Sequence, residues 1–151
     1  MMVLSWNVRG LNSIPRQKVV HRLIESQSPD VICIQETKLS IEGLANCASQ
    51  IWPQGSWQGF GALNSLGGVA CFWDPRKVSL LWWISSQFSI SLVASNFETG
   101  ERFFLSNIYA PTDFLGKSYL WTHINFLRSL DLFLPWIMAG DFNDITSFEE
   151  K

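Results

Sequence analysis

The first third of the chain changes between two hydrophobic patterns that predict different elements. Apolar and polar residues alternate over Val3–Val8, which is the period of a strand with one buried face. Ser13 and Pro15 are typical of a helix start, and apolar residues at helical spacing continue to about Ser28. Val31–Ile34 is then a continuous apolar run. Strand, helix and strand in this order predict a βαβ unit with parallel strands and a right-handed crossover.

After a second, weaker helix at about Ile41–Ile51, the pattern changes to short apolar runs separated by turn residues. We interpret these runs as the strands of an antiparallel meander. The expected strands are Gly59–Leu63, Val69–Trp73, Val78–Ile84, Phe88–Ala94 and Phe103–Tyr109. A last helix over about Ser118–Leu130 and a strand at Trp136–Ala139 complete the prediction. The fold class is α/β with a mixed sheet, and residues 1–151 are expected to form one domain.

Composition places the chain among globular proteins. It has 151 residues, of which 47% are hydrophobic and 16% charged, and these values exclude a disordered chain. The formal net charge is −2, whereas tight binding to phosphate backbones by charge alone usually needs a basic surface. If the protein meets nucleic acid, we therefore expect a divalent cation to supply part of the attraction.

The cysteines and the start of the chain bear on the cellular compartment. Cys33, Cys47 and Cys71 share no CxxC spacing, and two of them lie in expected buried strands. This favours small buried side chains in a reducing compartment over a disulfide or a zinc site. We find neither a secretory signal nor an apolar run that could span a bilayer. We expect a soluble, intracellular protein that is not secreted, with no membrane association and no obligate protein partner.

Polar side chains collect where the expected strands end. They are Asn7, Gln35 and Glu36, Asn107 and Tyr109, and Asp141 and Asn143. Ligands of open α/β sheets bind outside the carboxyl ends of the strands, so these positions favour one shared site.

The residue types suit phosphodiester hydrolysis with Mg²⁺ or Mn²⁺. Mg²⁺ is typically held by one or two carboxylates, and Glu36 offers a carboxylate with the neutral oxygen of Asn7 beside it. Arg9 and Lys38 are cations placed to meet phosphate, and Asn107 is grouped with them as an expected contact to phosphate or DNA.

The other end of the site supplies groups for the reaction itself. Asp141 is expected to take a proton from the attacking water, and Asn143 to orient that water or a phosphate oxygen. Tyr109 offers a phenolic hydroxyl to the developing negative charge.

These residues lie in motifs that resemble, in family order, those of the endonuclease/exonuclease/phosphatase superfamily, which has the DNase I-like fold. The motifs are Ser5–Leu11, Gln35–Lys38, Gly67–Val69, Asn107–Thr112 and Gly140–Asn143. The amino-acid sequence of these motifs, including the closing stretch Asp141–Lys151, most resembles that of the endonuclease domains of plant non-LTR (LINE-type) retrotransposons. The resemblance implies the N-terminal part of a four-layer α/β sandwich with mixed sheets, and an Mg²⁺-dependent endonuclease that acts on DNA in the nucleus.

The resemblance also implies roles for individual residues. Asn7 and Glu36 would bind the metal, Tyr109 would contact the phosphate, and Asp141 with Asn143 would handle the nucleophile.

Two departures from the family pattern bear on activity. Arg9 stands where many abasic-site repair nucleases carry an acidic residue, which favours the retroelement branch. The family's downstream Asp and its Ser-Asp-His motif do not occur, so we expect a C-terminally truncated domain with impaired activity. The alternatives are a non-catalytic remnant of a decayed retroelement and a phosphatase of the same superfamily that acts on phosphoinositides or another small phosphoester.

Other candidate features have structural interpretations. His21 and His123 lie beside the apolar stripes of expected helices, and neither follows an Asp. Gly67-Gly68 lacks the Lys-Ser/Thr of a phosphate loop and is interpreted as a turn. The Trp82-Trp83 pair is of the kind that stacks on bases, but within Val78–Ile84 we interpret it as core or as a covered sheet surface.

Overall fold

The computed structural model describes residues 1–64, 66–130 and 132–144. The closing residues 145–151, which contribute to the retrotransposon resemblance, lie outside this part. In chain order the elements are β1 (Val3–Asn7), α1 (Ile14–Gln27), β2 (Val31–Gln35), α2 (Ile41–Ile51), β3 (Ser56–Phe60), β4 (Val69–Trp73), β5 (Val78–Ser86), β6 (Ser89–Asn96), β7 (Arg102–Tyr109), α3 (Phe114–Ser129) and β8 (Trp136–Asp141).

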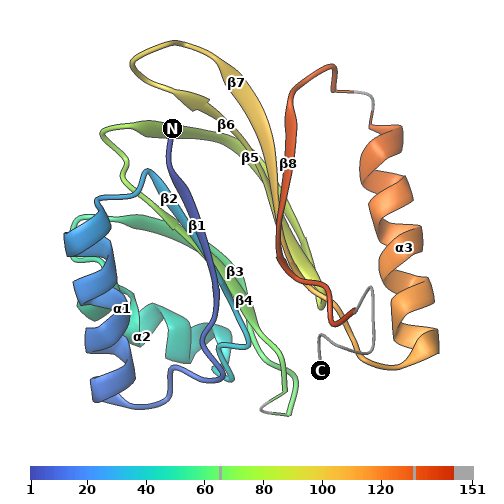
Figure 1. Cartoon of the computed structure of the whole chain (residues 1–151), viewed down its shortest axis with the longest axis horizontal. Helices are drawn as coiled ribbons and strands as arrows, with labels where there is room; N and C mark the ends of the chain where they lie inside the picture. The colour runs from blue at the N-terminus through green and yellow to red at the C-terminus, as the bar shows by residue number, and fades with distance from the viewer. Residues whose placement is uncertain (65, 131, 145–151) are drawn as a thin grey trace.

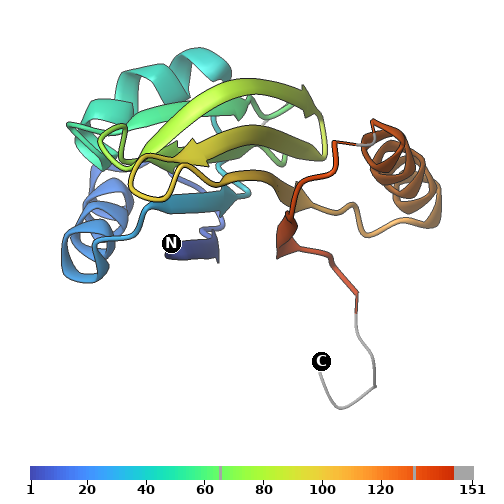
Figure 2. The ribbon, with the colours of Figure 1, turned by 90° about the horizontal axis from the view of Figure 1, so that it is seen from above.

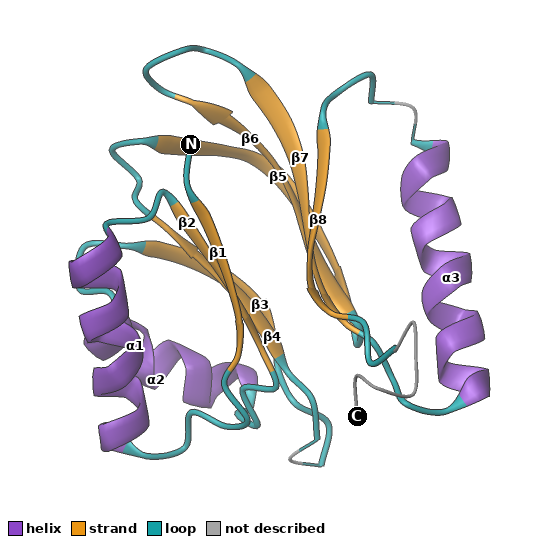
Figure 3. Ribbon diagram, in the orientation of Figure 1, coloured by secondary structure: helices purple, strands orange, loops and turns teal. Residues whose placement is uncertain are grey.

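These elements form four layers, in the order helices, sheet, sheet, helix (Figure 1). The first sheet has the strand order β1-β2-β4-β3 and the second has the order β5-β6-β7-β8. Each sheet is mixed, because the pairs β1–β2 and β7–β8 are parallel and the others are antiparallel. Helices α1 and α2 lie on the outer face of the first sheet, and α3 lies on the outer face of the second (Figure 3). The expected four-layer α/β sandwich is confirmed.

Alternation along the strands places their apolar side chains in two separate cores, one between helices and sheet and one between the two sheets. Residues of β2 that face outward, Ile32 and Ile34, pack with Val20 and Ile24 of α1, whereas the inward-facing Cys33 packs between the sheets. The inter-sheet core also contains apolar residues of β4, β6 and β7. Alternation in β1 has the same result, because Leu4 and Trp6 pack on the helix side, whereas Val3 packs in the core between the sheets, on the side that also carries Ser5 and Asn7. The polar ends of the strands are therefore directed between the two sheets.

The prediction of one antiparallel meander is wrong, because the expected strands belong to two different sheets. Strand β4 pairs with β2 and β3, whereas β5 begins the second sheet and continues through β6 to β7. Local alternation does not specify partners, and the turn Asp74–Lys77 leads the chain from one sheet to the other. Only the strands from Val78 to Tyr109 form a meander.

Several element boundaries also differ from the sequence prediction, most clearly at β3 and α3. The strand expected at Gly59–Leu63 is β3 and ends at Phe60, because Ala62 N–H already donates to Leu39 O in the neighbouring loop. Helix α3 begins four residues earlier than expected, where the Asp113 carboxylate accepts from Gly116 N–H at 2.8 Å and caps the first turn.

Strands β1 and β8 form the edges of the two sheets on one side of the sandwich and contact each other (Figure 2). On the opposite side, β5 exposes Leu81, Trp82 and Trp83, which are 45%, 36% and 43% accessible. The interpretation of the tryptophan pair as core is therefore wrong, because the pair lies on an edge strand. In the described parts of the chain, no helix combines the length and the apolar character needed to cross a bilayer.

Candidate functional site

Polar side chains from both sheets meet where the parallel strand pairs end. In the first sheet Asn7 is in register with Gln35, and in the second Tyr109 is in register with Asp141. Because inward positions alternate along each strand, these residues continue the inter-sheet face beyond its apolar part. The structure therefore brings the ends of β1, β2, β7 and β8 to one location.

A hydrogen bond between Asn7 and Asp141 joins the two sheets at this point. Asn7 Nδ2 donates to Asp141 Oδ2 at 2.7 Å, although 134 positions separate the two residues in the sequence. The Asn7 side-chain oxygen accepts from Arg9 N–H at 3.0 Å, and its second lone pair is available for a cation. The residue expected to bind metal and the residue expected to activate water are thus in direct contact.

Glu36 and Lys38 lie on a tight loop after β2. Both residues have a φ of 56°, and Lys38 Nζ lies 3.0 Å from Glu36 Oε1. The loop is fixed on one side by Thr37 N–H and Lys38 N–H, which donate to the carbonyls of Gly68 and Gly67. Lys38, expected to contact phosphate, therefore neutralises the carboxylate expected to bind the cation.

Gly67 and Gly68, interpreted from the sequence as a turn, lie in the β3–β4 loop just after the bridge between Leu63 and Leu66. Their φ values are +73° and +85°, in the region where an L side chain is strained. A Cβ at Gly68 would also collide with the hydroxyl of Thr37. Glycine at this position allows the β3–β4 loop to support the loop that carries Glu36.

Tyr109 lies close enough to both carboxylates to feel their charge. Burial raises the pKa of its phenol above the ordinary 10.0, and the charges of Glu36 and Asp141 raise it further. The phenol therefore keeps its proton at neutral pH and can donate a hydrogen bond to a phosphate oxygen.

The segment after β8 places Asn143 beside Asp141. Asn143 N–H donates to Asp141 Oδ1 at 2.9 Å, so that this carboxylate is held by one donor on each oxygen. Asn143 Nδ2 donates to Ala110 O at 2.6 Å, which leaves its side-chain oxygen as the free end of the amide. Lys117 of α3 donates to the backbone carbonyl of Asn143 at 2.8 Å. Sequence reasoning missed Lys117, because it placed this residue in a loop before the last helix.

The expected role of Asn107 at phosphate or DNA is wrong, because the side chain is buried and its amide is bound by protein groups. The residue is 0% exposed, and its Nδ2 donates to the carbonyls of Ile34 and Ala70. Its oxygen accepts from Gln35 Nε2 at 2.6 Å. Asn107 thus ties the second sheet to β2 and β4 directly beneath the site, because a buried amide must satisfy both of its polar ends.

The donor set fits a hard cation. Among residues 1–64, 66–130 and 132–144, no three His, Cys, Asp or Glu side chains gather in a group that could hold a metal ion. Two carboxylates, Glu36 and Asp141, and the amide oxygen of Asn7 remain, and Mg²⁺ typically needs only one or two carboxylates. Arg9 is exposed at the rim of the site.

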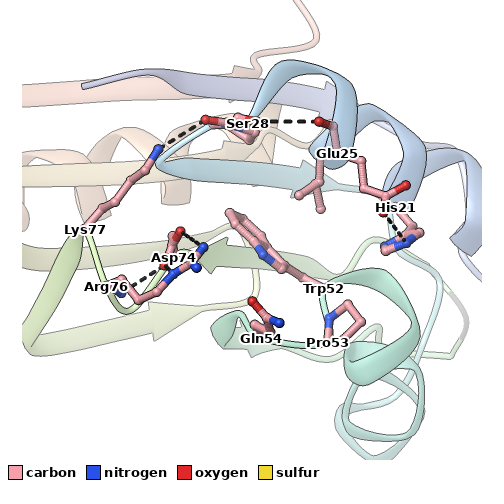
Figure 4. Close-up of a pocket in the computed structure, with 11 residues that line it drawn as sticks. His21, Glu25, Ser28, Trp52, Pro53, Gln54, Asp74, Arg76 and Lys77 are labelled. Atoms are coloured by element: carbon pink, nitrogen blue, oxygen red, sulfur yellow. Dashed lines mark hydrogen bonds and ion pairs between the residues drawn. The ribbon is translucent and has the colours of Figure 1, made fainter.

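A cavity of about 390 Å³ lies at the other end of the first sheet, between α1, the end of α2 and the β4–β5 turn (Figure 4). Its charged groups pair with one another or with nearby groups. Arg76 binds Asp74, Lys77 binds Asp30, and His21 lies 3.4 Å from Glu25. His21 Nδ1 also lies 3.1 Å from Ile51 O, which supports its structural interpretation.

His123 has a structural setting as well. Its Nε2 lies 2.9 Å from Ser89 Oγ, beneath α3, and burial lowers the pKa of the imidazole. The ring is therefore neutral at pH 7 and lies on the outer side of the second sheet, away from the inter-sheet face on which Tyr109 and Asp141 lie.

Known proteins resemble this chain over nearly all of its length. The sequence model described as "Endonuclease/Exonuclease/phosphatase family" matches residues 4–150. An exodeoxyribonuclease of Bacillus subtilis is 22% identical over 95% of this chain and 58% of its own length. DNA repair nuclease APEX1 of Danio rerio is 24% identical over 95% of this chain and 49% of its own length. This chain therefore corresponds to only part of each nuclease.

A solved structure is similar in fold. The mannosyl-6-phosphatase of Bacteroides thetaiotaomicron superposes with a TM-score of 0.75, at 16% identity, over 98% of this chain and 67% of that one. At this identity the likeness concerns the fold alone.

Proposed function

Because the chain belongs to the endonuclease/exonuclease/phosphatase family, we propose that its polar site hydrolyses phosphodiesters with the help of Mg²⁺ or Mn²⁺. The observation that carries this proposal is the 2.7 Å hydrogen bond between Asn7 and Asp141, which unites the two halves of the site. Glu36 and Asn7 hold the cation. When bound, the cation neutralises charge on the phosphate and lowers the barrier to nucleophilic attack.

The side chains of the site then have separate tasks. Asp141 accepts the proton of the attacking water, and the donors Asn7 and Asn143 fix the orientation of its carboxylate. Tyr109, protonated at neutral pH, donates a hydrogen bond to a non-bridging oxygen, where negative charge develops. Arg9 and Lys38 contact phosphate groups of the substrate.

The substrate we propose is DNA, and the origin we propose is a non-LTR retrotransposon whose endonuclease acts in the nucleus. Two relatives whose names specify action on DNA support the substrate. The sequences of the motifs and the presence of Arg9 support the retroelement branch over an abasic-site repair enzyme.

We further propose that these 151 residues supply the first part of a longer endonuclease domain. The matched nucleases extend well beyond the region that this chain covers, since it spans 58% and 49% of them. Groups that meet the scissile phosphate from the other side would then come from outside these residues. One general acid or base contributes roughly 10²–10⁴ in rate, so the chain alone should be a weak catalyst.

Nicking of supercoiled plasmid DNA in Mg²⁺ or Mn²⁺ tests the proposal. We expect slow nicking by the chain alone and faster nicking when the C-terminal segment of a similar full-length retroelement endonuclease is added. Asp141→Asn should lower both rates by roughly 100-fold or more, because the proton acceptor is lost. Asp113→Asn is the matched control, since Asn also caps helices well and the N-cap of α3 lies outside the site.

Nicking that is unaffected by Asp141→Asn contradicts the assignment of the site. No nicking with the added segment contradicts the nuclease proposal and supports a non-catalytic remnant. Faster hydrolysis of a soluble phosphoinositide headgroup or sugar phosphate than of DNA supports the phosphatase alternative.

A further inference from the structure

A second recess adjoins the proposed phosphate site and shares Tyr109 with it. It has a volume of about 320 Å³ and lies between the β3–β4 loop, the β5–β6 turn and the segment after β7. Its apolar walls come from Leu63, Leu66, Phe88 and Pro111, together with the Tyr109 ring. Recesses of a few hundred Å³ with apolar walls are typical of sites for small organic groups.

The walls are attached to the same backbone that positions the phosphate site. Leu63 and Leu66 exchange backbone hydrogen bonds of 3.1 and 2.9 Å, which close the tip of the β3–β4 loop. Tyr109 N–H donates to Phe88 O at 2.8 Å. A Cβ built on Gly67 would lie 3.6 Å from two ring atoms of Tyr109, so the loop passes next to the phenol ring. The recess therefore has a fixed position relative to Glu36 and Asp141.

Two leucines at the tip of the β3–β4 loop are exposed. Leu63 is 53% accessible and Leu66 is 74% accessible, and both line the recess that Tyr109 also lines. Apolar area that remains in water forgoes the stabilisation that a covering group would give. A ligand that covers these side chains would recover it.

The chemistry of the recess selects the kind of group that fits. None of the described residues that line it is charged, and its polar side chains include the carboxamides of Asn64 and Gln87. An uncharged recess does not suit a second phosphate or a phosphorylated sugar headgroup. A nucleobase fits, because it is planar and uncharged, has apolar faces and carries hydrogen-bonding groups on its edge.

We propose that this recess receives the nucleobase next to the scissile phosphodiester, turned out of the base stack. The proposal rests on the proposed function, because it places the phosphate at Tyr109. The loop leucines and Phe88 cover the faces of the base, and the carboxamides contact its edge. Substrates in which this base is unpaired, and so costs less to unstack, are bound best.

Binding of two small phosphodiesters tests the assignment without relying on turnover. One is thymidylyl-thymidine, and the other is the same diester with hydrogen in place of both bases. Each is titrated into the 151-residue chain by calorimetry in Ca²⁺. We expect the wild type to bind the first roughly tenfold more tightly, since covering one base face contributes about 1–3 kcal/mol.

Leu66→Ser should reduce this preference roughly threefold or more and leave the affinity for the base-free diester unchanged. Leu66 is largely exposed, so the substitution is compatible with folding. Leu115→Ser is the matched control, because Leu115 is 63% exposed on α3 and does not line the recess. It should leave both affinities unchanged.

Equal binding of the two diesters by the wild type overturns the proposal, and so does no binding of either. An equal loss for both diesters in Leu66→Ser, or the same effect in Leu115→Ser, overturns it as well. The proposed function fails separately, if Asp141→Asn leaves nicking unchanged. A base preference that depends on Leu66 stands even in that case.

Discussion

We expect the ion pair between Glu36 and Lys38 to influence the cation affinity of the proposed site. Both residues lie on one short loop, and the ammonium is 3.0 Å from the carboxylate oxygen. Glu36 is only 17% exposed, so the pair is partly shielded from water. A divalent cation at Glu36 must therefore displace this ammonium, and the cost of displacing it weakens binding.

Removing the ammonium should strengthen cation binding. We expect Lys38→Met to raise the Mn²⁺ affinity roughly two- to fivefold, because an exposed or partly exposed ion pair contributes about 0.2–1 kcal/mol. Glu36→Gln should lower the affinity roughly tenfold or more, since a full charge at contact distance is lost. Titration calorimetry measures both, with the exposed Lys18→Met of α1 as control. Equal affinities for the wild type and Glu36→Gln would show that the cation binds elsewhere.

At the scale of elements, the β3–β4 loop supports the Glu36 loop through Gly67 and Gly68. Both glycines have positive φ, and their carbonyls accept from Lys38 N–H and Thr37 N–H at 2.9 and 3.1 Å. A side chain at Gly68 would meet the hydroxyl of Thr37 and, at 3.2 Å, the backbone N of Ala62. The contact between the two loops therefore depends on the absence of a side chain.

A pair of glycine substitutions separates backbone strain from this close contact. Gly68 has a φ of +85° and Gly100 has a φ of +70°, but no atom lies within 4 Å of a Cβ on Gly100. Both changes to Ala carry the strain of positive φ, and only Gly68→Ala adds a collision. We expect Gly68→Ala to cost about 1–3 kcal/mol more of unfolding free energy than Gly100→Ala, as overpacking usually does. Urea denaturation of the two variants decides, and equal losses would mean that the loops do not pack as described.

Local signals in the sequence were sufficient for the elements and for part of the site. Alternation in β1 correctly separated Asn7 from its apolar neighbours, and polar residues at strand ends correctly indicated that Asn7 and Asp141 belong together. Pairing between distant strands was not predictable, because alternation carries no information about partners. For that reason the sequence assigned β4 to one meander with the later strands.

The role of Asn107 could not be predicted from its position in the sequence alone. Asn107 lies two positions before Tyr109 in β7 and belongs to the same motif, but it is buried between the sheets, whereas Tyr109 is at the end of the strand. There its amide satisfies Ile34 O, Ala70 O and Gln35 Nε2. Whether a polar residue at a strand end faces ligand or binds the opposite sheet depends on the sheet packed against it.

For the whole molecule, the arrangement of carboxylates distinguishes the two ends of the sandwich. Asp30 and Asp74 lie away from the polar site, beside Lys77 and Arg76. Hydrogen bonds from Arg76 hold the pKa of Asp74 below its ordinary range, although burial opposes this shift. Asp141, in contrast, is held by the neutral donors Asn7 and Asn143. Glu36 of the polar site is also paired, with Lys38, but among the described residues no cationic side chain is paired with Asp141. A divalent cation should therefore prefer the polar site, where one of the two carboxylates has no ion pair with a described residue.

Paramagnetic broadening by Mn²⁺ tests most directly whether the meeting point of the two sheets is the cation site. Trace Mn²⁺ added to the isotope-labelled chain broadens the amide resonances of nearby residues. We expect selective broadening at Val8 and Thr37 in the first sheet's loops and at Ala110 and Asp141 in the second sheet. Glu36→Gln should abolish it. Broadening concentrated around Asp30 and Asp74 instead, or broadening that survives Glu36→Gln, would contradict the proposed site.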